Sequence, residues 1–141
     1  MDRRSPSTFE ELLELEPEEL VRAAAERADE VISIWHRAQG CPPLDLDAPS
    51  RALSIVRNWL RTGVTSSEIK SLAANAYSVV ASSNLPHGSP ERAAGRAAAH
   101  TAFALHFLSL DMPEKVLAAA RDAISSAELA SEATRRTTPS P

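Results

Sequence analysis

Apolar residues recur along most of this chain at spacings of three and four, which is the period of an amphipathic helix rather than of a strand. Prolines divide the pattern into stretches of helical length. The first long stretch starts at Pro17, a residue suited to the first helical position, and should run to about Gln39 before Gly40 stops it. Its predicted core residues are Leu20, Ala24, Val31, Ile34, Trp35 and Ala38.

The next two stretches also carry helix signals at their ends. Asp47 is a natural N-cap for a second helix, which Gly63 should end. Thr65 and Glu68 have capping-box spacing and predict the start of a third helix that closes near Ser83. The second helix should bury Leu53, Val56 and Leu60, with Ile55 and Trp59 beside them, and the third should bury Ile69, Leu72, Ala73, Ala76 and Val80.

Two more long helices are predicted in the second half of the chain. Ser89 followed by Pro90 supplies an N-cap and first helical position for a helix that runs to about Ser109. Asp111 and Pro113 begin a final helix, and Ser7 with Glu10 predicts a short helical turn ahead of Pro17. The final helix should bury Val116, Leu117, Ala120, Ile124 and Ala127.

Short connections between these segments favour antiparallel neighbours. We therefore expect an all-α fold, a single-domain antiparallel bundle of about five helices, and a length of 141 residues fits one domain. Residues 1–16 should form an acidic N-terminal segment with a short helix, residues 17–133 the helical bundle, and residues 134–141 a disordered tail.

Composition sharpens the helical prediction at one position. The chain has 25 alanines and 4 glycines, which favours helices over strands, although GC-rich codon usage would also raise the alanine content. Gly95 is the one glycine inside a predicted helix, within a run of small residues from Ala93 to Ala99. We expect this run to approach a neighbouring helix closely, while Phe103 and Phe107 fill volume farther along; the alternative is a tolerated surface glycine.

Charge and cysteine usage narrow the classes of partner and location. The net charge of −4 lacks the basic surface that nucleic-acid binding needs. Residues 1–46 hold eleven acidic and five basic side chains, so the excess of acidic residues is concentrated in the N-terminal part of the chain. Cys41 is the single cysteine and cannot form an internal disulfide, no signal-peptide pattern opens the chain, and no apolar run is long enough for a membrane span. We expect a cytoplasmic protein without a membrane or nucleic-acid partner.

The residues that could support catalysis or metal binding do not form a recognisable motif. His36, His87, His100 and His106 lack the spacing of three or four that a helical metal pair needs. His100 lies on one helical stripe with Phe103 and Phe107, so we expect a semi-buried imidazole with a structural partner. Cys41 has no evident base, and neither a nucleophile elbow nor a glycine-rich phosphate loop is present. The sequence therefore predicts no enzyme activity, no cofactor and no metal.

Acidic and aromatic residues are the remaining candidates for partner binding. The glutamates near the start of the chain could steer a basic partner, or they could form the solvated beginning of a helix, where the dipole favours acids. Trp35 and Trp59 fit the core better than a binding hot spot, because each falls on or beside an apolar stripe. The candidate partner-binding residues are Glu10, Glu11, Glu14, Glu18 and Glu19.

The stretch from about Leu20 to Ala127 resembles bacterial immunity proteins of the Imm-5-like group, which accompany polymorphic toxins. The segment PSRALSIVRNWLRTG, residues 49–63, is similar to a family segment with proline, alanine, arginine, tryptophan and glycine in this order. ADEVI at 28–32 and AAGRAAAHTA at 93–102 resemble two alanine-rich family helices, whereas residues 110–113 depart from the family pattern. The resemblance implies a helical protein that binds and neutralises a cognate toxin protein without catalysis.

Three hypotheses follow for function. The first is an immunity protein that occludes a basic toxin domain, with the acidic face from Glu10 to Glu19 as a candidate contact. The second is a helical bundle that binds a small ligand or a metal, with His100 among the lining groups. The third is an oligomeric interaction scaffold, such as a homodimer, in which alanine-rich faces pair between chains.

Overall fold

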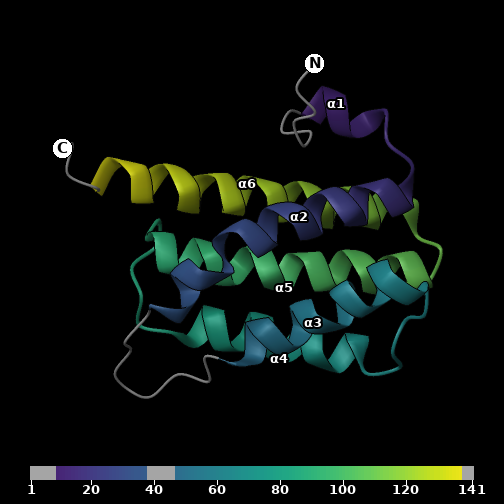
Figure 1. Cartoon of the computed structure of the whole chain (residues 1–141), viewed down its shortest axis with the longest axis horizontal. Coiled ribbons are helices and arrows are strands. Elements are labelled where there is room, and N and C mark those ends of the chain that lie inside the picture. Colours follow the sequence, from purple (N-terminus) through teal and green to yellow (C-terminus); the bar gives the residue numbers. More distant parts are fainter. Residues whose placement is uncertain (1–8, 38–46, 138–141) are drawn as a thin grey trace.

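A computed structural model describes residues 9–37 and 47–137, and these residues form six α-helices without a β-strand (Figure 1). The all-α prediction is confirmed. The sequence predicts about five long helices, and the sixth helix is the short one that precedes them. The helices are α1 (Phe9–Leu13), α2 (Pro17–His36), α3 (Asp47–Thr62), α4 (Ile69–Ser82), α5 (Pro90–Ser109) and α6 (Pro113–Thr137).

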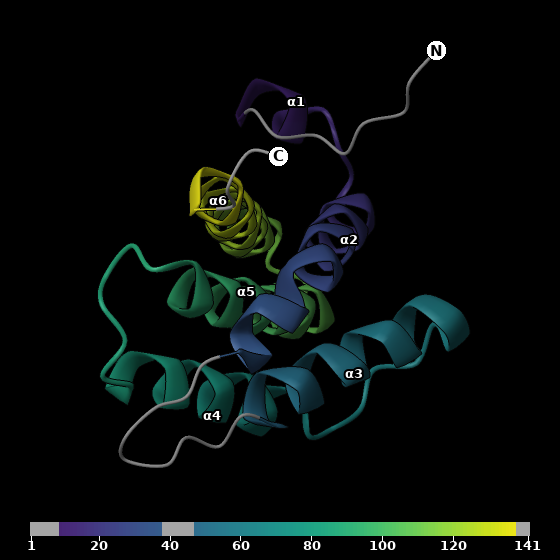
Figure 2. The ribbon, with the colours of Figure 1, turned by 60° about the vertical axis from the view of Figure 1, so that its left-hand side comes forward.

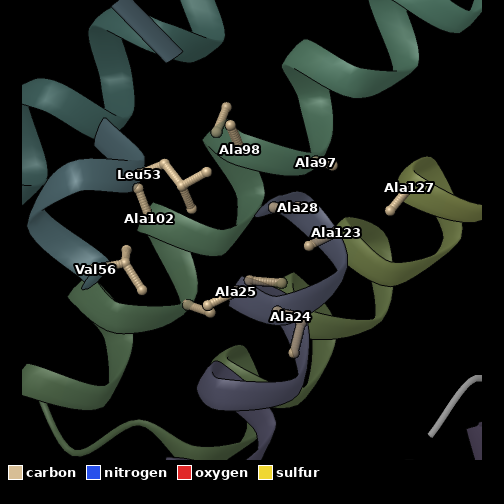
Figure 3. Packing of buried hydrophobic residues seen from close by; sticks show 14 of the residues in the cluster. Ala24, Ala25, Ala28, Leu53, Val56, Ala97, Ala98, Ala102, Ala123 and Ala127 are labelled. Atoms are coloured by element: carbon tan, nitrogen blue, oxygen red, sulfur yellow. The ribbon is translucent and has the colours of Figure 1, made fainter. Parts of the chain in front are cut away.

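Helix α5 is the centre of the bundle. It packs against α2, α3, α4 and α6, and Figure 2 shows it between α6 on one side and α4 on the other. Alanine makes up most of the buried apolar residues, so the helices can approach one another closely. Figure 3 shows alanines of α2, α5 and α6 gathered between these helices, with Leu53 and Val56 of α3 approaching from the far side of α5.

The predicted core stripes are largely confirmed. On α2, Leu20, Ala24, Val31, Ile34 and Trp35 are buried, and Ala38 lies outside the described residues. The remaining predicted residues divide into two groups. Leu53, Val56, Ile69, Ala73, Ala76, Val80, Val116, Ala120, Ile124 and Ala127 are buried, and Ile55, Trp59, Leu60, Leu72 and Leu117 are partly buried against the same core.

Gly95 lies where α5 meets two other helices. A Cβ atom at this position would stand 2.6 Å from Cε3 of Trp35 on α2 and 2.7 Å from Cγ2 of Val80 on α4. Both distances are shorter than van der Waals contact, so the backbone of α5 approaches these side chains as only glycine permits. The prediction of close packing is confirmed, and the alternative of a surface glycine is wrong because Gly95 is buried.

Three predicted helix starts agree with the structure and one does not. Pro17, Pro90 and Pro113 each begin a helix, and the Ser89 hydroxyl accepts a hydrogen bond from the Arg92 backbone amide at 3.3 Å. The capping box predicted from Thr65 and Glu68 is wrong. Helix α4 starts only at Ile69, and Glu68 has helical dihedral angles at the N-cap without a side-chain cap hydrogen bond.

The local reason is that Ser66 supplies the competing hydrogen bond. Its hydroxyl accepts from the Glu68 backbone amide at 3.1 Å, which forms a turn ahead of the helix. The Ser66 carbonyl then accepts from the Ile69 backbone amide at 3.2 Å. Helix α4 therefore begins one turn later than the spacing of Thr65 and Glu68 predicts.

The last helix is longer than predicted. Helix α6 continues to Thr137, so residues 134–137 belong to it rather than to a disordered tail. No proline or glycine interrupts the chain between Pro113 and Pro139, and the Thr134 hydroxyl accepts a hydrogen bond from the Arg37 guanidinium at 3.4 Å. Residues 138–141, Ser7, Gly40 and Cys41 lie outside the described residues.

Candidate binding surfaces

The predicted partner-binding glutamates lie at the N-terminal end of the described chain. Two of them are on α1, one is in the connection to α2, and two are in the first turn of α2. All five are exposed. We call them the acidic segment: Glu10, Glu11, Glu14, Glu18 and Glu19.

Local contacts hold the acidic segment on the bundle. Leu12 is 1% exposed and anchors α1 among the core residues, and α1 packs against α6. The Glu19 carboxylate accepts a hydrogen bond from the Glu16 backbone amide at 3.1 Å, so Glu19 also caps α2. Leu13, by contrast, is 56% exposed and lies between Glu10 and Glu14 in sequence.

A second surface is an open groove over the C-terminal half of α5. It has a volume of about 400 Å³ and its lining is mostly apolar. Helix α4 contributes one wall, α5 the floor and α6 the other wall. We call this the aromatic groove, and its lining residues are Tyr77, His100, Phe103, Phe107, Lys115, Ala118, Ala119 and Asp122.

Aromatic rings make an almost continuous surface along the groove. The Phe103 and Phe107 rings stack with centroids 6.1 Å apart. Tyr77 meets both the His100 ring, at 5.7 Å between centroids, and the Phe103 ring, at 6.2 Å, in edge-on geometry. Tyr77 remains 44% exposed, so this apolar surface is accessible from solvent. Exposed aromatic surface of this kind is typical of binding sites.

His100 has an unusual environment for a histidine. Its Nε2 atom is buried and has no hydrogen-bond partner among the described residues. Burial lowers the pKa of the imidazole below its usual value, Asp122 acts in the opposite direction, and Arg96 lowers the pKa further. The ring is therefore neutral near pH 7. The expected semi-buried position is confirmed, and the Tyr77 ring packs against the imidazole, while Nε2 has no hydrogen-bond partner in the described part of the chain.

Charged side chains stand at both ends of the groove. At the Phe107 end, the Lys115 ammonium lies 5.5 Å from the centroid of the Phe107 ring, within the range of a cation–π contact. Desolvation lowers the pKa of the neighbouring His106, and the charge of Lys70 lowers it further. At the His100 end, the nearby carboxylate is that of Asp122. The groove therefore has a cationic end and an end that contains a carboxylate.

A smaller hollow is also lined by Tyr77. It has a volume of about 150 Å³, and His87, Arg92 and Arg96 are among its lining residues. The Arg92 guanidinium donates hydrogen bonds to carbonyl groups that follow α4, at 3.1 Å to Leu85 and 3.3 Å to Ser83. Arg92 thus holds the end of α4 and the following loop, so it has a structural role in this hollow.

The remaining histidines and acids do not come together as a metal site. Within residues 9–37 and 47–137, no group of three or more histidine, cysteine, aspartate or glutamate side chains could hold a metal ion. The His36 ring nitrogen Nε2 forms a 2.7 Å hydrogen bond with the Ser50 hydroxyl, which links α2 to α3. None of the helices in the described part of the chain has the length and apolar character to cross a lipid bilayer.

The sequence predicts only those groove residues that lie on α5. The spacing of His100, Phe103 and Phe107 placed these residues on one stripe of a helix. Tyr77 and Lys115 were missed, because they are distant in sequence and meet only when α4 and α6 pack on either side of α5. The acidic segment contributes no residue to the groove, so the structure presents two separate surfaces.

Comparison with known proteins identifies no relative: no family model, no curated protein and no solved structure matches this chain.

Proposed function

We propose that this chain is a non-catalytic binding protein that neutralises a cognate bacterial toxin, and that its acidic segment contacts a basic surface of that toxin. The resemblance of residues 49–63 to a segment of immunity proteins supports the toxin as partner. The concentration of acid in residues 1–46 supports a basic contact surface, because clustered like charge accelerates association with an oppositely charged protein.

The exposed position of Leu13 is the observation that carries this proposal. Its side chain is 56% exposed on a helix whose neighbouring carboxylates, Glu10 and Glu14, are exposed as well. A partner that contacts these carboxylates would also cover the Leu13 side chain, and this apolar burial would add to the charge attraction. The fixed position of Leu12 in the core holds this arrangement in place.

The test takes as candidate partners the products of the reading frames that lie next to the gene for this chain. Binding is measured by isothermal titration calorimetry, and protection is measured as growth of cells that express both proteins. Replacing three exposed carboxylates by Gln, at Glu10, Glu14 and Glu18, should weaken binding about tenfold to a hundredfold at low salt, mainly through slower association.

A matched variant controls for the loss of charge. It replaces three exposed glutamates elsewhere, Glu68, Glu114 and Glu132, by Gln, which changes the net charge by the same amount. This variant should bind as the wild type does. Equal weakening by both triple variants would refute the acidic segment as the contact, and failure of the wild-type chain to bind or protect would refute the toxin as partner.

The second candidate function is the binding of a small ligand. The aromatic groove favours it, because its volume and its exposed rings are typical of ligand sites.

A further inference from the structure

The dimensions of the aromatic groove fit a small molecule. The groove extends along α6 from Lys115 to Asp122, a separation of seven residues, which corresponds to about 10 Å of helix. Its volume of about 400 Å³ is within the range of ligand pockets. This length is two turns of helix, which is short for the seat of a partner helix and long enough for a single ring with a short side chain.

The interior of the groove selects a planar apolar body. The stacked rings of Phe103 and Phe107 form a floor, and Tyr77 borders it from α4. Ala118 and Ala119 on α6 are small, so they leave space above this floor. A bound aromatic ring could contact the phenylalanine rings in offset or edge-on geometry, which adds to the gain from apolar burial.

The charges select the orientation of such a molecule. Lys115 contacts the Phe107 ring and forms no ion pair with a carboxylate in the described part of the chain. An anionic group on the ligand would therefore find an available ammonium group at this end. At the other end, the Asp122 carboxylate repels an anion and accepts hydrogen bonds, and Nε2 of His100 lacks a partner.

We propose that the aromatic groove binds a small aromatic carboxylic acid. Its carboxylate pairs with Lys115, its ring packs on Phe103 and Phe107 beside Tyr77, and a hydroxyl or N–H group on the ring points towards Asp122. This proposal is independent of toxin binding, because none of the acidic segment lines the groove.

The probe is 3-(4-hydroxyphenyl)propionate, with tyramine as its matched cation. Tyramine keeps the hydroxyphenyl ring and replaces the carboxylate by an ammonium group. Calorimetry at pH 7 and low salt should give a dissociation constant on the order of 10⁻⁴ M for the acid, the strength expected for about twelve heavy atoms. Tyramine should bind at least tenfold more weakly, because Lys115 repels it.

Two variants identify the site. Lys115→Gln should weaken binding of the acid roughly fivefold to tenfold, since it removes the charge and keeps much of the side-chain length. Ala118→Leu should weaken it as well, because the larger side chain enters the groove. Arg22→Gln is the control, since Arg22 is an exposed cation on α2 outside the groove, and it should bind as the wild type does.

The outcomes separate cleanly, provided that circular dichroism shows an unchanged melting temperature for each variant. Selective binding of the acid that Lys115→Gln and Ala118→Leu weaken supports the proposal. Absence of binding, equal binding of tyramine, or unchanged binding by both groove variants would overturn it. If the aromatic groove binds no aromatic acid, the test of toxin binding is unaffected, because the glutamate variants alter the acidic segment and not the groove.

Discussion

The two halves of α5 face different surroundings although they belong to one uninterrupted helix of small and aromatic residues. In the first half, Gly95 is buried against Trp35 and Val80, with no room for a Cβ atom. In the second half, Phe103 and Phe107 lie under an open groove of about 400 Å³. In the N-terminal half, large side chains of neighbouring helices pack against the small residues of α5. In the C-terminal half, α5 itself carries the large side chains, and the neighbouring helices do not cover them completely.

The difference shows how volume is distributed between helices. Close packing needs a large side chain on one helix and a small one opposite it, and Trp35 of α2 facing Gly95 meets this condition. Over Phe103 and Phe107, α6 contributes Ala118 and Ala119, which leave space unfilled. One helix can therefore be closely packed core at one end and the floor of an open groove at the other.

The largest expected effect on stability comes from removing one aromatic ring next to each half of α5. These rings are Trp35 of α2, which packs on the N-terminal half, and Phe107 in the C-terminal half. Trp35 is fully buried, so Trp35→Ala should cost about 3–5 kcal/mol in the free energy of unfolding. Phe107 is partly exposed, so Phe107→Ala should cost only about 1 kcal/mol. Urea denaturation measures both changes. Equal losses would show that the two halves are packed to the same degree.

The next effect concerns the close approach at Gly95. Gly95→Ala improves helix propensity by about 1 kcal/mol, but the new methyl group meets Trp35 and Val80, and overpacking costs about 1–3 kcal/mol. We expect a net loss of roughly 1 kcal/mol in the free energy of unfolding. Arg96→Ala on the exposed side of α5 is the matched control and should change stability by less than about 0.5 kcal/mol. A Gly95→Ala variant more stable than the wild type would contradict the close approach.

The smallest effect is a dependence of stability on pH at the groove. Burial lowers the pKa of His100 in the folded chain below its value near 6.5 in the unfolded chain. As the pH falls through 6.5, the unfolded chain binds the proton first, so the stabilising contribution of neutral His100 is present above this pH and is lost below it. Asp122 opposes this shift and Arg96 reinforces it.

The measurement is the free energy of unfolding of the wild type and of His100→Gln between pH 7.5 and pH 5. The wild type should lose stability relative to the variant as the pH falls, whereas His106 titrates in both proteins and cancels in the comparison. Parallel curves would show that burial of His100 does not affect its protonation.

The helices were predictable where the determining signals are local. Ser89 with Pro90 lies within one turn of the helix that it starts, and the structure confirms this start. The prediction from Thr65 and Glu68 was wrong because Ser66, inside the same turn, makes a competing hydrogen bond. Spacing alone cannot show which of two nearby hydroxyl groups will bond the backbone.

The groove was only half predictable, for a different physical reason. The stripe of His100, Phe103 and Phe107 follows from helical period, but period does not show whether a neighbouring helix covers it. Cover depends on the crossing of α4 and α6 over α5, which brings Tyr77 and Lys115 to the same place. The close contact at Gly95 was predictable because glycine weakens a helix relative to alanine, so a glycine among alanines indicates a place where a methyl group does not fit.

The central claim is that the groove over the C-terminal half of α5 binds an aromatic acid, whereas the face of α5 around Gly95 is closed core. Two-dimensional NMR of the ¹⁵N-labelled chain, titrated with 3-(4-hydroxyphenyl)propionate, tests this most directly. We expect saturable shifts at backbone amides of Phe103, Phe107 and Lys115, and none at Gly95 or Ala97. Shifts that are absent, or equally large at Gly95 and Phe107, would contradict the claim.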